Sequence, residues 1–291
     1  MLSVSVSACV DVGQTWLDLG FFPSAKPLRA PNTPDGIEKI IAALRSKGAV
    51  KVVLEATGSY ARKLVCALVA AGIPVFVVNP RRIKAFRDAE GLIAKTDRLG
   101  AALIARFAHK MSHDLRPPPD TELLTLKALS ARRRQLTELA AMEKTRLKQA
   151  SDEIVIASCK ELVAVIDEKC AVIEEEIARL VTSDARLSRR RDILLSIPGV
   201  GKRISTLVVI EMPELGEIDR KAAASLVGVA PHPSQSGLSK GRNAIAGGRP
   251  CLRAAFYMAA LVAARTHPKF KQLYKDMRTS GTPPRKSPSS P

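Results

Sequence analysis

The first part of the chain alternates hydrophobic and polar positions with the period of a β-strand. Residues 3–12 alternate serine and valine, which predicts a half-buried strand. Residues 13–15 can turn the chain, and the apolar run 16–22 then pairs back as a hairpin. The Pro- and Asn-rich stretch 23–32 predicts a loop.

After this hairpin the pattern changes to alternating helices and strands. Thr33 and Pro34 provide an N-cap and a first-turn proline for a helix that ends at Gly48. The further segments expected are a strand over 50–54, a helix over 60–71 capped by Ser59, a strand over 73–78 and a helix over 101–108. This order favours an α/β domain with a mixed sheet.

The middle of the chain predicts two long helices, because it has almost no glycine or proline after the prolines at 117–119. Apolar residues recur at spacings of three and four, which is the pattern of a coiled-coil seam. They are Cys159, Leu162, Ile166, Cys170, Ile173, Ile177 and Leu180. The pattern fits equally a hairpin within one chain and a pairing across a dimer.

The third part opens with a glycine-rich turn between two helical segments. Gly199 and Gly201 stand in an apolar-Pro-Gly-apolar-Gly pattern that is typical of a helix-hairpin-helix motif. Such glycines let backbone N–H groups approach a DNA phosphate. Lys202 and Arg203, which follow at once, favour the DNA interpretation over a plain helix–helix turn.

A Ser- and Gly-rich loop, residues 231–242, comes next and contains Lys240 and Arg242. Such a loop can bind phosphate or present a hydroxyl group. A helix over 251–265 follows, with Arg253 near its positive end. The last segment, 278–291, has the composition of a disordered tail.

Charge narrows the class of partner. The 291 residues carry a formal net charge of +18, and the excess is concentrated at 1–115 and 189–291, while 116–188 is nearly balanced. Two basic blocks favour a polyanionic partner, and they favour nucleic acid over a membrane surface. The five cysteines form no CxxC pair, which predicts buried thiols in a reducing cytosol. We expect no signal peptide and no membrane span.

Three carboxylates stand where secondary-structure elements begin or end. Asp11 and Glu55 each close an apolar strand, and Asp97 opens the helix over 101–108. Acidic groups at such positions can converge to hold a hard cation such as Mg²⁺. An N-cap is the alternative for Asp97 alone.

A basic segment lies before Asp97 in the sequence, with Arg81, Arg82 and Lys84 around one aromatic residue. Phosphate contact and a solvated helix face are equally good interpretations of this segment.

Short motifs in a fixed order resemble the DEDD-type insertion-sequence transposases, a family that includes the Piv-type DNA invertases. The resemblance covers about residues 5–275. Its marks are Asp11, Glu55-Ala56-Thr57-Gly58, Asn79-Pro80, Lys95-Thr96-Asp97, Ile197 to Gly201, Gly228 to Pro231, Gln235-Ser236-Gly237, and Gly248 with Leu252-Arg253.

The resemblance implies an RNase H-like (RuvC-like) domain over 1–116, a helical region over 117–187 that joins subunits, and a mostly helical transposase domain over 188–277. It implies Mg²⁺ as cofactor, Asp11, Glu55 and Asp97 as metal ligands, and Ser236 as nucleophile. Family members act on DNA as dimers or tetramers in the bacterial cytoplasm, and several use a structured guide RNA.

One position departs from the family pattern. The fourth acid is expected three residues after Asp97, and this chain has Gly100 there. Asp88, Glu90 or a water molecule can fill that role. The alternatives to an active transposase are therefore a catalytically impaired nucleic-acid-binding relic and a RuvC-like nuclease without serine chemistry.

Overall fold

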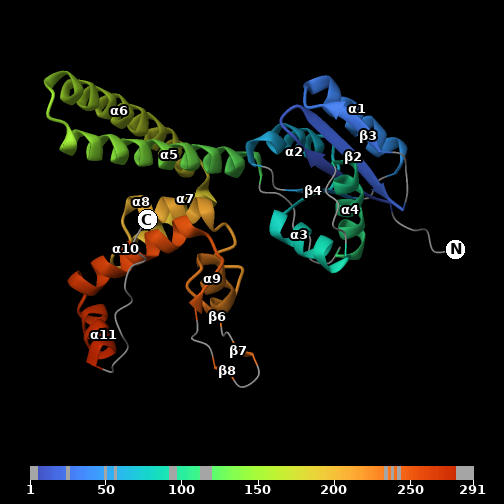
Figure 1. The fold of residues 1–291 in the computed structure, drawn as a ribbon. Coiled ribbons are helices and arrows are strands. Elements are labelled where there is room, and N and C mark those ends of the chain that lie inside the picture. The colour runs from blue at the N-terminus through green and yellow to red at the C-terminus, as the bar shows by residue number, and fades with distance from the viewer. Residues whose placement is uncertain are drawn as a thin grey trace. The chain divides into compact units, whose positions relative to one another are not determined.

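The computed structural model describes residues 6–23, 27–48, 51–55, 58–91, 97–111, 120–232, 235–236, 239–240 and 244–279. The chain divides into two compact units, Met1–Leu124 and Thr125–Pro291. Figure 1 shows the elements of both units.

The first unit is built on a mixed five-stranded sheet in the order β3-β2-β1-β4-β5. Its strands are β1 (Ser7–Val12), β2 (Trp16–Phe22), β3 (Leu28–Pro31), β4 (Lys51–Glu55) and β5 (Val75–Val78). The β1–β2 and β2–β3 pairs are antiparallel, whereas β1–β4 and β4–β5 are parallel. The predicted hairpin and the mixed α/β sheet are confirmed.

Alternation along the strands sends side chains to two different layers. Val10 and Leu54 pack under α1 (Pro34–Ser46) and α2 (Arg62–Ala70). Cys9 and Val53, one residue earlier on the same strands, pack under α3 (Pro80–Ala89) and α4 (Asp97–Lys110). The sheet is therefore buried on both faces, as parallel strands require.

The expected caps of the first unit are partly confirmed. Thr33 accepts a hydrogen bond from the Gly36 N–H at 3.3 Å, and Pro34 opens α1. The prediction that Ser59 caps an α-helix is wrong, because Gly58–Ala61 forms a short 3₁₀ helix, η1, and α2 begins only at Arg62.

The prediction of a loop over 23–32 is also wrong, because β3 lies within it. β3 extends the sheet as an edge strand, and Arg29 binds the buried carboxylate of Asp18 on β2 with two hydrogen bonds of 2.8 Å. An edge strand tolerates Pro31 at its end.

The second unit begins with a helical hairpin, α5 (Thr121–Gln149) and α6 (Glu153–Ser183). Leu136 and Ala140 of α5 pack on Ile166 of α6, and Figure 1 shows the two helices running side by side. The predicted seam therefore packs within one chain, although Leu162, which was assigned to it, is exposed.

Shorter helices complete the second unit. They are α7 (Ala185–Leu195), α8 (Lys202–Glu211), α9 (Arg220–Val227), α10 (Pro250–Thr266) and α11 (Pro268–Thr279). The first four share a buried core with the adjoining ends of α5 and α6. The prediction of a tail over 278–291 is wrong at its start, because residues 278 and 279 belong to α11, and residues 280–291 lie outside the described residues. In the described part of the chain, no helix is long and apolar enough to cross a membrane.

Candidate active site and nucleic-acid-binding residues

Asp11 and Glu55 lie on neighbouring parallel strands at the same edge of the sheet. The register pairs Val10 with Leu54, so the next residues along each strand are the two acids. Adjacent strands are about 4.8 Å apart. Asp11 stands two residues after Cys9, and Glu55 two residues after Val53, on the same strands. Since side chains two residues apart share a face of the sheet, both acids point to the face that α3 and α4 cover.

Helix α4 runs antiparallel to β1 across this face. The Cys9 thiol donates a hydrogen bond to the Ala101 carbonyl at 2.5 Å. Nearer the start of β1, the ring of Phe22, whose Cα pairs with Ser7, lies 4.7 Å from the ring of His109. The N-terminus of α4 therefore points toward the end of β1 that carries Asp11.

The lengths of the two elements bring the backbone of Asp97 to the level of Asp11. Asp97 is four residues before Ala101, or about 6 Å along a helix. Asp11 is two residues after Cys9, or about 6.6 Å along a strand. Asp97 is the first residue of α4, as predicted, and its side chain lies outside the described residues. Among the described side chains, no three His, Cys, Asp or Glu gather into a metal site.

A close approach between β2 and α4 holds this arrangement. Gly20 lies under Ala101, and a Cβ added to it would stand 2.9 Å from the Ala101 carbonyl carbon. Beside it, burial is the main cause that raises the pKa of the Cys9 thiol, which stays protonated and available as a donor.

Glu90 is engaged at the other end of α4. Its carboxylate binds Arg106 and, at 2.7 Å, Lys110, which stand nine and thirteen residues after Asp97. The hydrogen bond from Lys110 is the largest cause that lowers the pKa of Glu90. Two cations far from the helix start therefore occupy this acid, which argues against Glu90 as the missing ligand. Asp88 lies at the same end of α3, 3.6 Å from Arg87.

The basic segment forms α3, with Asn79 as its N-cap. Arg81, Arg82 and Lys84 are exposed, while Ile83 is buried against α4. The guanidinium of Arg82 lies 5.6 Å from the ring centroid of Phe107. These side chains are accessible to a phosphate backbone, although one of them also stacks on α4.

Ser236 lies on a small arm between α9 and α10. Two-residue strands form it: β6 (Pro231–His232) pairs with β9 (Ala244–Ile245), and β7 (Gln235–Ser236) pairs with β8 (Ser239–Lys240). Ser236 stands directly opposite Ser239 in this ladder. The side chains of Ser236 and Lys240, and all of Arg242, lie outside the described residues.

The base of the arm is tightly closed. A Cβ on Gly248 would stand 2.3 Å from the Cα of Gly228, so the two glycine backbones touch. The guanidinium of Arg253 donates to the carbonyl of Gly247. Arg253 was predicted to bind nucleic acid, and the structure turns its Nη2 toward the base of the arm.

Arg249 fixes the second side of this base. Its guanidinium binds Glu214 with two hydrogen bonds, at 2.6 and 2.9 Å. The backbone N–H of Arg249 donates to the Leu226 carbonyl at 2.8 Å. Burial raises the pKa of Glu214, but the Arg249 hydrogen bond and nearby positive charge outweigh it, so the net shift is downward.

The predicted glycine turn joins α7 to α8. Gly199 has a φ of +86° and packs against α10, where a Cβ would meet the Ala259 carbonyl oxygen at 2.3 Å. Gly201 precedes α8 and has open space around it. Gly199 therefore serves packing, and Gly201 leaves the start of α8 accessible.

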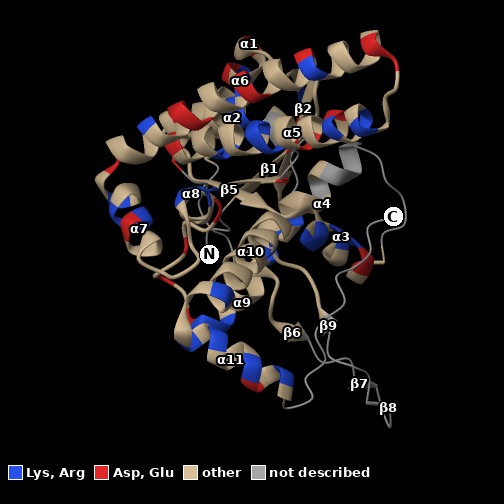
Figure 2. Cartoon of the chain, turned by 90° about the vertical axis from the view of Figure 1, so that its left-hand side faces the viewer, with Lys and Arg blue, Asp and Glu red and all other residues tan. Residues whose placement is uncertain are grey.

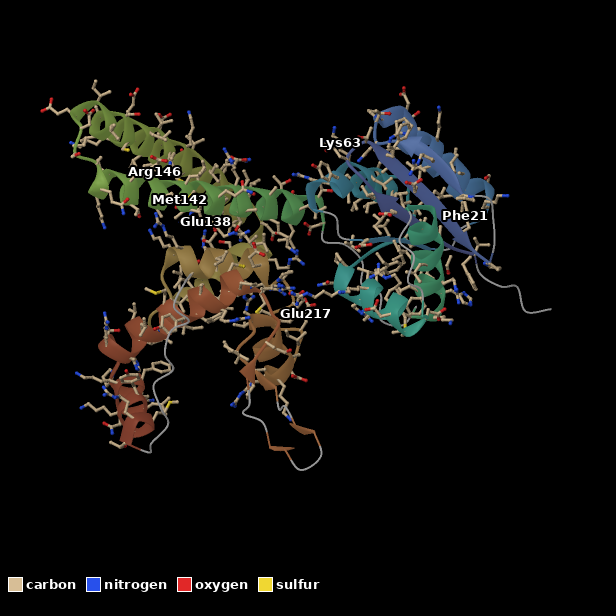
Figure 3. All side chains as sticks on the ribbon, in the orientation of Figure 1. Phe21, Lys63, Glu138, Met142, Arg146 and Glu217 are labelled. Carbon is tan, nitrogen blue, oxygen red and sulfur yellow. The ribbon has the colours of Figure 1, made fainter. Side chains whose placement is uncertain are left out.

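Lys202 and Arg203 are both exposed at that helix start and line a cavity of about 150 Å³ between α5, α6 and α8. Glu174 bridges Arg133 at 2.6 Å and Arg203 at 3.2 Å in its wall. Elsewhere in the second unit Arg190 donates a hydrogen bond of 3.1 Å to the exposed Glu217, which is labelled in Figure 3.

Comparisons with known proteins decide the family. A transposase model of the DEDD type matches residues 24–156, and a model described as transposase IS116/IS110/IS902 family matches residues 191–275. The chain belongs to the IS110/IS116 transposase family. The pilin gene-inverting protein of Moraxella bovis is 28% identical over 234 residues, which cover 79% of this chain and 72% of that protein. The Moraxella lacunata protein of the same name is 29% identical over the same coverage.

Membership of the IS110/IS116 family gives the chain a function class, DNA transposition or site-specific recombination. The motifs that suggested the family mark positions on the polypeptide, and the contacts that position them were not visible in the sequence. Three residues that make these positioning contacts, and that the sequence analysis did not identify, are Gly20, Glu214 and Arg249. A signal for them was present only in residue type, as a glycine within an apolar strand and an Arg beside two glycines.

Proposed function

We propose that this chain cuts and rejoins DNA as the transposase of an insertion sequence, with metal-binding carboxylates and a nucleophilic serine. The observation that carries the proposal is the register of β1, β4 and α4. It brings Asp11, Glu55 and the backbone of Asp97 to one edge of the sheet. Family membership supplies the DNA substrate class.

The donor set fits a hard divalent cation. Asp11 and Glu55 offer carboxylate oxygens from adjacent strands, and carboxylates are the protein ligands that Mg²⁺ takes. Asp97 would complete three ligands from the start of α4. When bound, Mg²⁺ polarises the scissile phosphate and stabilises the leaving oxygen.

Ser236 is the proposed nucleophile. Its Oγ loses a proton and forms a bond to phosphorus, while the bond from phosphorus to the leaving sugar oxygen breaks and that oxygen takes up a proton. The phosphoserine ester keeps the bond energy. Attack by a new sugar hydroxyl reverses the step, joins the DNA and restores the serine.

Basic residues of both units are proposed to hold the nucleic acid. Arg81, Arg82 and Lys84 line α3, and Lys202 and Arg203 line the start of α8. Lys240 and Arg242 follow Ser236 within the Ser- and Gly-rich loop. The proposal includes a structured guide RNA as a partner and a homo-oligomer, dimer or tetramer, as the active form.

The experiment that tests this function looks for a covalent adduct. Protein, Mg²⁺, the candidate guide RNA and end-labelled DNA spanning the element junction are incubated and separated under denaturing conditions. We expect a labelled protein band with the wild type and none with Ser236→Ala or Asp11→Ala, while both variants still retain the DNA in a native gel. Ser239→Ala is the matched control, since Ser239 pairs with Ser236 in the arm.

The outcomes are distinct. Loss of the adduct in Ser239→Ala alone would make that residue the nucleophile. Cleaved DNA without any adduct would support a RuvC-like nuclease. Loss of DNA retention in Ser236→Ala and Asp11→Ala would give both residues a structural role.

Gly100 favours a second candidate function, a relic that binds nucleic acid without cutting it. Gly100 lies in the first turn of α4, three residues after Asp97 and on the same helix face. Gly100→Asp restores the family's fourth acid. A gain of adduct in this variant supports the impaired relic, and equal activity before and after shows that three acids suffice.

A further inference from the structure

Helix α11 is amphipathic, and the large apolar side chains of one face are exposed in the part of the chain that the structure describes. Phe270, Leu273, Tyr274 and Met277 recur at spacings of three and four, so they share one face. Leu273 is 54% exposed and Tyr274 47%, and no residue of α11 is buried. Tyr257, Met258 and Val262 of the contacting helix α10 are exposed as well. Large apolar side chains exposed on two contacting helices indicate a site of interaction.

Cations border this face on one side. Lys271 and Arg278 stand seven residues apart along the same flank of α11. In the described part of the chain neither is within ion-pair distance of a carboxylate. The helix as a whole has a net charge of +3.

Helix α6 carries the complementary pattern on its outer face, away from the seam with α5. Val165 and Val172 stand seven residues apart and are 45% and 58% exposed. Glu168 and Glu175 border them, also seven residues apart. Glu168 contacts its neighbour Lys169 at 3.2 Å, but both side chains are exposed and such a pair contributes little. The net charge of α6 is −4.

The two patterns match in spacing and in hand. Seven residues are about 10.5 Å along a helix, so Lys271 and Arg278 match Glu168 and Glu175 in separation. When two helices pack in parallel, the flank to one side of the apolar stripe on the first helix meets the flank to the other side of the stripe on the second helix. On α11 the cations lie to one side of the apolar stripe, and on α6 the acids lie to the other side, so the two charged flanks can meet. Figure 2 shows the acidic residues along α6 and the basic residues along α11.

We propose that α11 of one copy of this chain packs on the outer face of α6 of a second copy. Both stripes are exposed within one chain, and Figures 1 and 2 show α11 and α6 apart in the second unit. A two-fold dimer repeats the contact, because each copy provides one α6 and one α11. The inference gives a surface to the proposed homo-oligomer, and its test does not depend on recombination.

The residues favour protein over nucleic acid as the partner. Leu273 has no polar atom to offer a base edge, and the thioether of Met277 is only a weak acceptor. Exposed Met, aromatic and Arg side chains are enriched in protein interfaces. The negative charge of α6 repels nucleic acid and attracts α11.

Charge reversal tests the contact. One variant is Lys271→Glu/Arg278→Glu, and the other is Glu168→Lys/Glu175→Lys. The matched control, Arg220→Glu/Lys221→Glu, reverses two exposed cations of α9. Each protein is freed of nucleic acid, checked for helix content by circular dichroism, and followed by sedimentation over a range of concentrations.

We expect the wild type and the control to self-associate, and each reversal to raise the dissociation constant about 10-fold or more. An equimolar mixture of the two reversal variants restores association, because each contact then pairs opposite charges again. A wild type that stays monomeric, or an equimolar mixture of the two reversal variants that does not associate, overturns the proposal. So does an α11 reversal that leaves sedimentation unchanged but weakens retention of single-stranded or double-stranded nucleic acid.

Discussion

The two units position their candidate catalytic residues through the same device, a glycine that lets two backbones touch. In the first unit Gly20 lets α4 approach β2, and in the second unit Gly228 and Gly248 meet at the base of the serine arm. The surroundings differ. Gly20 and Ala101 lie within an apolar layer, whereas charged hydrogen bonds of Arg249 and Arg253 close the arm.

The difference has a physical consequence. Apolar packing depends little on salt or on pH, while an Arg–carboxylate interaction weakens when the carboxylate is protonated. We therefore expect the sheet edge that carries Asp11 and Glu55 to keep its geometry over a wide range of salt concentration and pH. The arm of the second unit should respond to pH through Glu214.

The largest effect is expected for Gly248→Ala. Its φ of +70° strains any L side chain, and the new methyl would stand 2.3 Å from the Gly228 backbone. Strain and overpacking together predict a loss of about 3 kcal/mol or more in the free energy of unfolding. Urea denaturation measures it. Gly247→Ala is the control, since its φ is +67° with open space around it, and it should lose only about 1 kcal/mol. Equal losses in the two variants would contradict a tight contact.

A smaller effect is expected for Gly20→Ala. The added methyl pushes α4 from the sheet, at a cost of about 1–3 kcal/mol. It should also speed amide hydrogen exchange in α4 and lower adduct formation, while nucleic-acid retention stays at the wild-type level. Gly13→Ala, whose methyl would meet only the Trp16 carbonyl oxygen at 3.3 Å and its N at 3.9 Å, is the milder control. Normal exchange in α4 of the Gly20 variant would show that this approach is not needed.

The smallest effect is expected for Glu214→Gln, which keeps a hydrogen-bonding partner for Arg249 but removes the charge. We expect a loss of about 1 kcal/mol at pH 7. The folded pKa of Glu214 is depressed, so its stabilisation is present above the unfolded-state value and disappears as pH falls through the folded one. Unfolding measured from pH 6 to pH 3 should therefore show less acid destabilisation in the variant. Glu217→Gln, at an exposed ion pair, should follow the wild type.

Much of the first unit could be predicted because its determinants are local. The alternation before Asp11 and the apolar run before Glu55 predicted two strands that end at these acids. The parallel register of β1 and β4 then puts both acids at one edge of the sheet. The start of α4 at Asp97 follows from the change of period. The strand at 28–31 was missed, since Pro31 and its neighbours resemble a loop and only pairing with β2 makes them a strand.

The contacts that hold the sites could not be predicted, because each depends on a residue far away in the chain. Gly20 is needed because of Ala101, 81 positions later. The place of Arg253 near a helix start suggested a contact with nucleic acid but did not reveal its hydrogen bond to the carbonyl of Gly247. The outer stripe of α6 was hidden by the inner seam, which has a similar spacing. Helix α5 has a second face of this kind, on which Glu138, Met142 and Arg146, labelled in Figure 3, follow one another at steps of four residues.

The pinned base of the arm also sets a limit on distance. His232 pairs with Ala244 in the ladder next to the base, and Ser236 is four residues further along. Four residues span at most about 14 Å when fully extended. Whatever conformation the arm takes, the serine stays within this radius of a fixed point on the second unit. Under the proposed serine chemistry, a reacting phosphate must come within this radius, so the point where the arm is anchored limits which DNA the serine can reach.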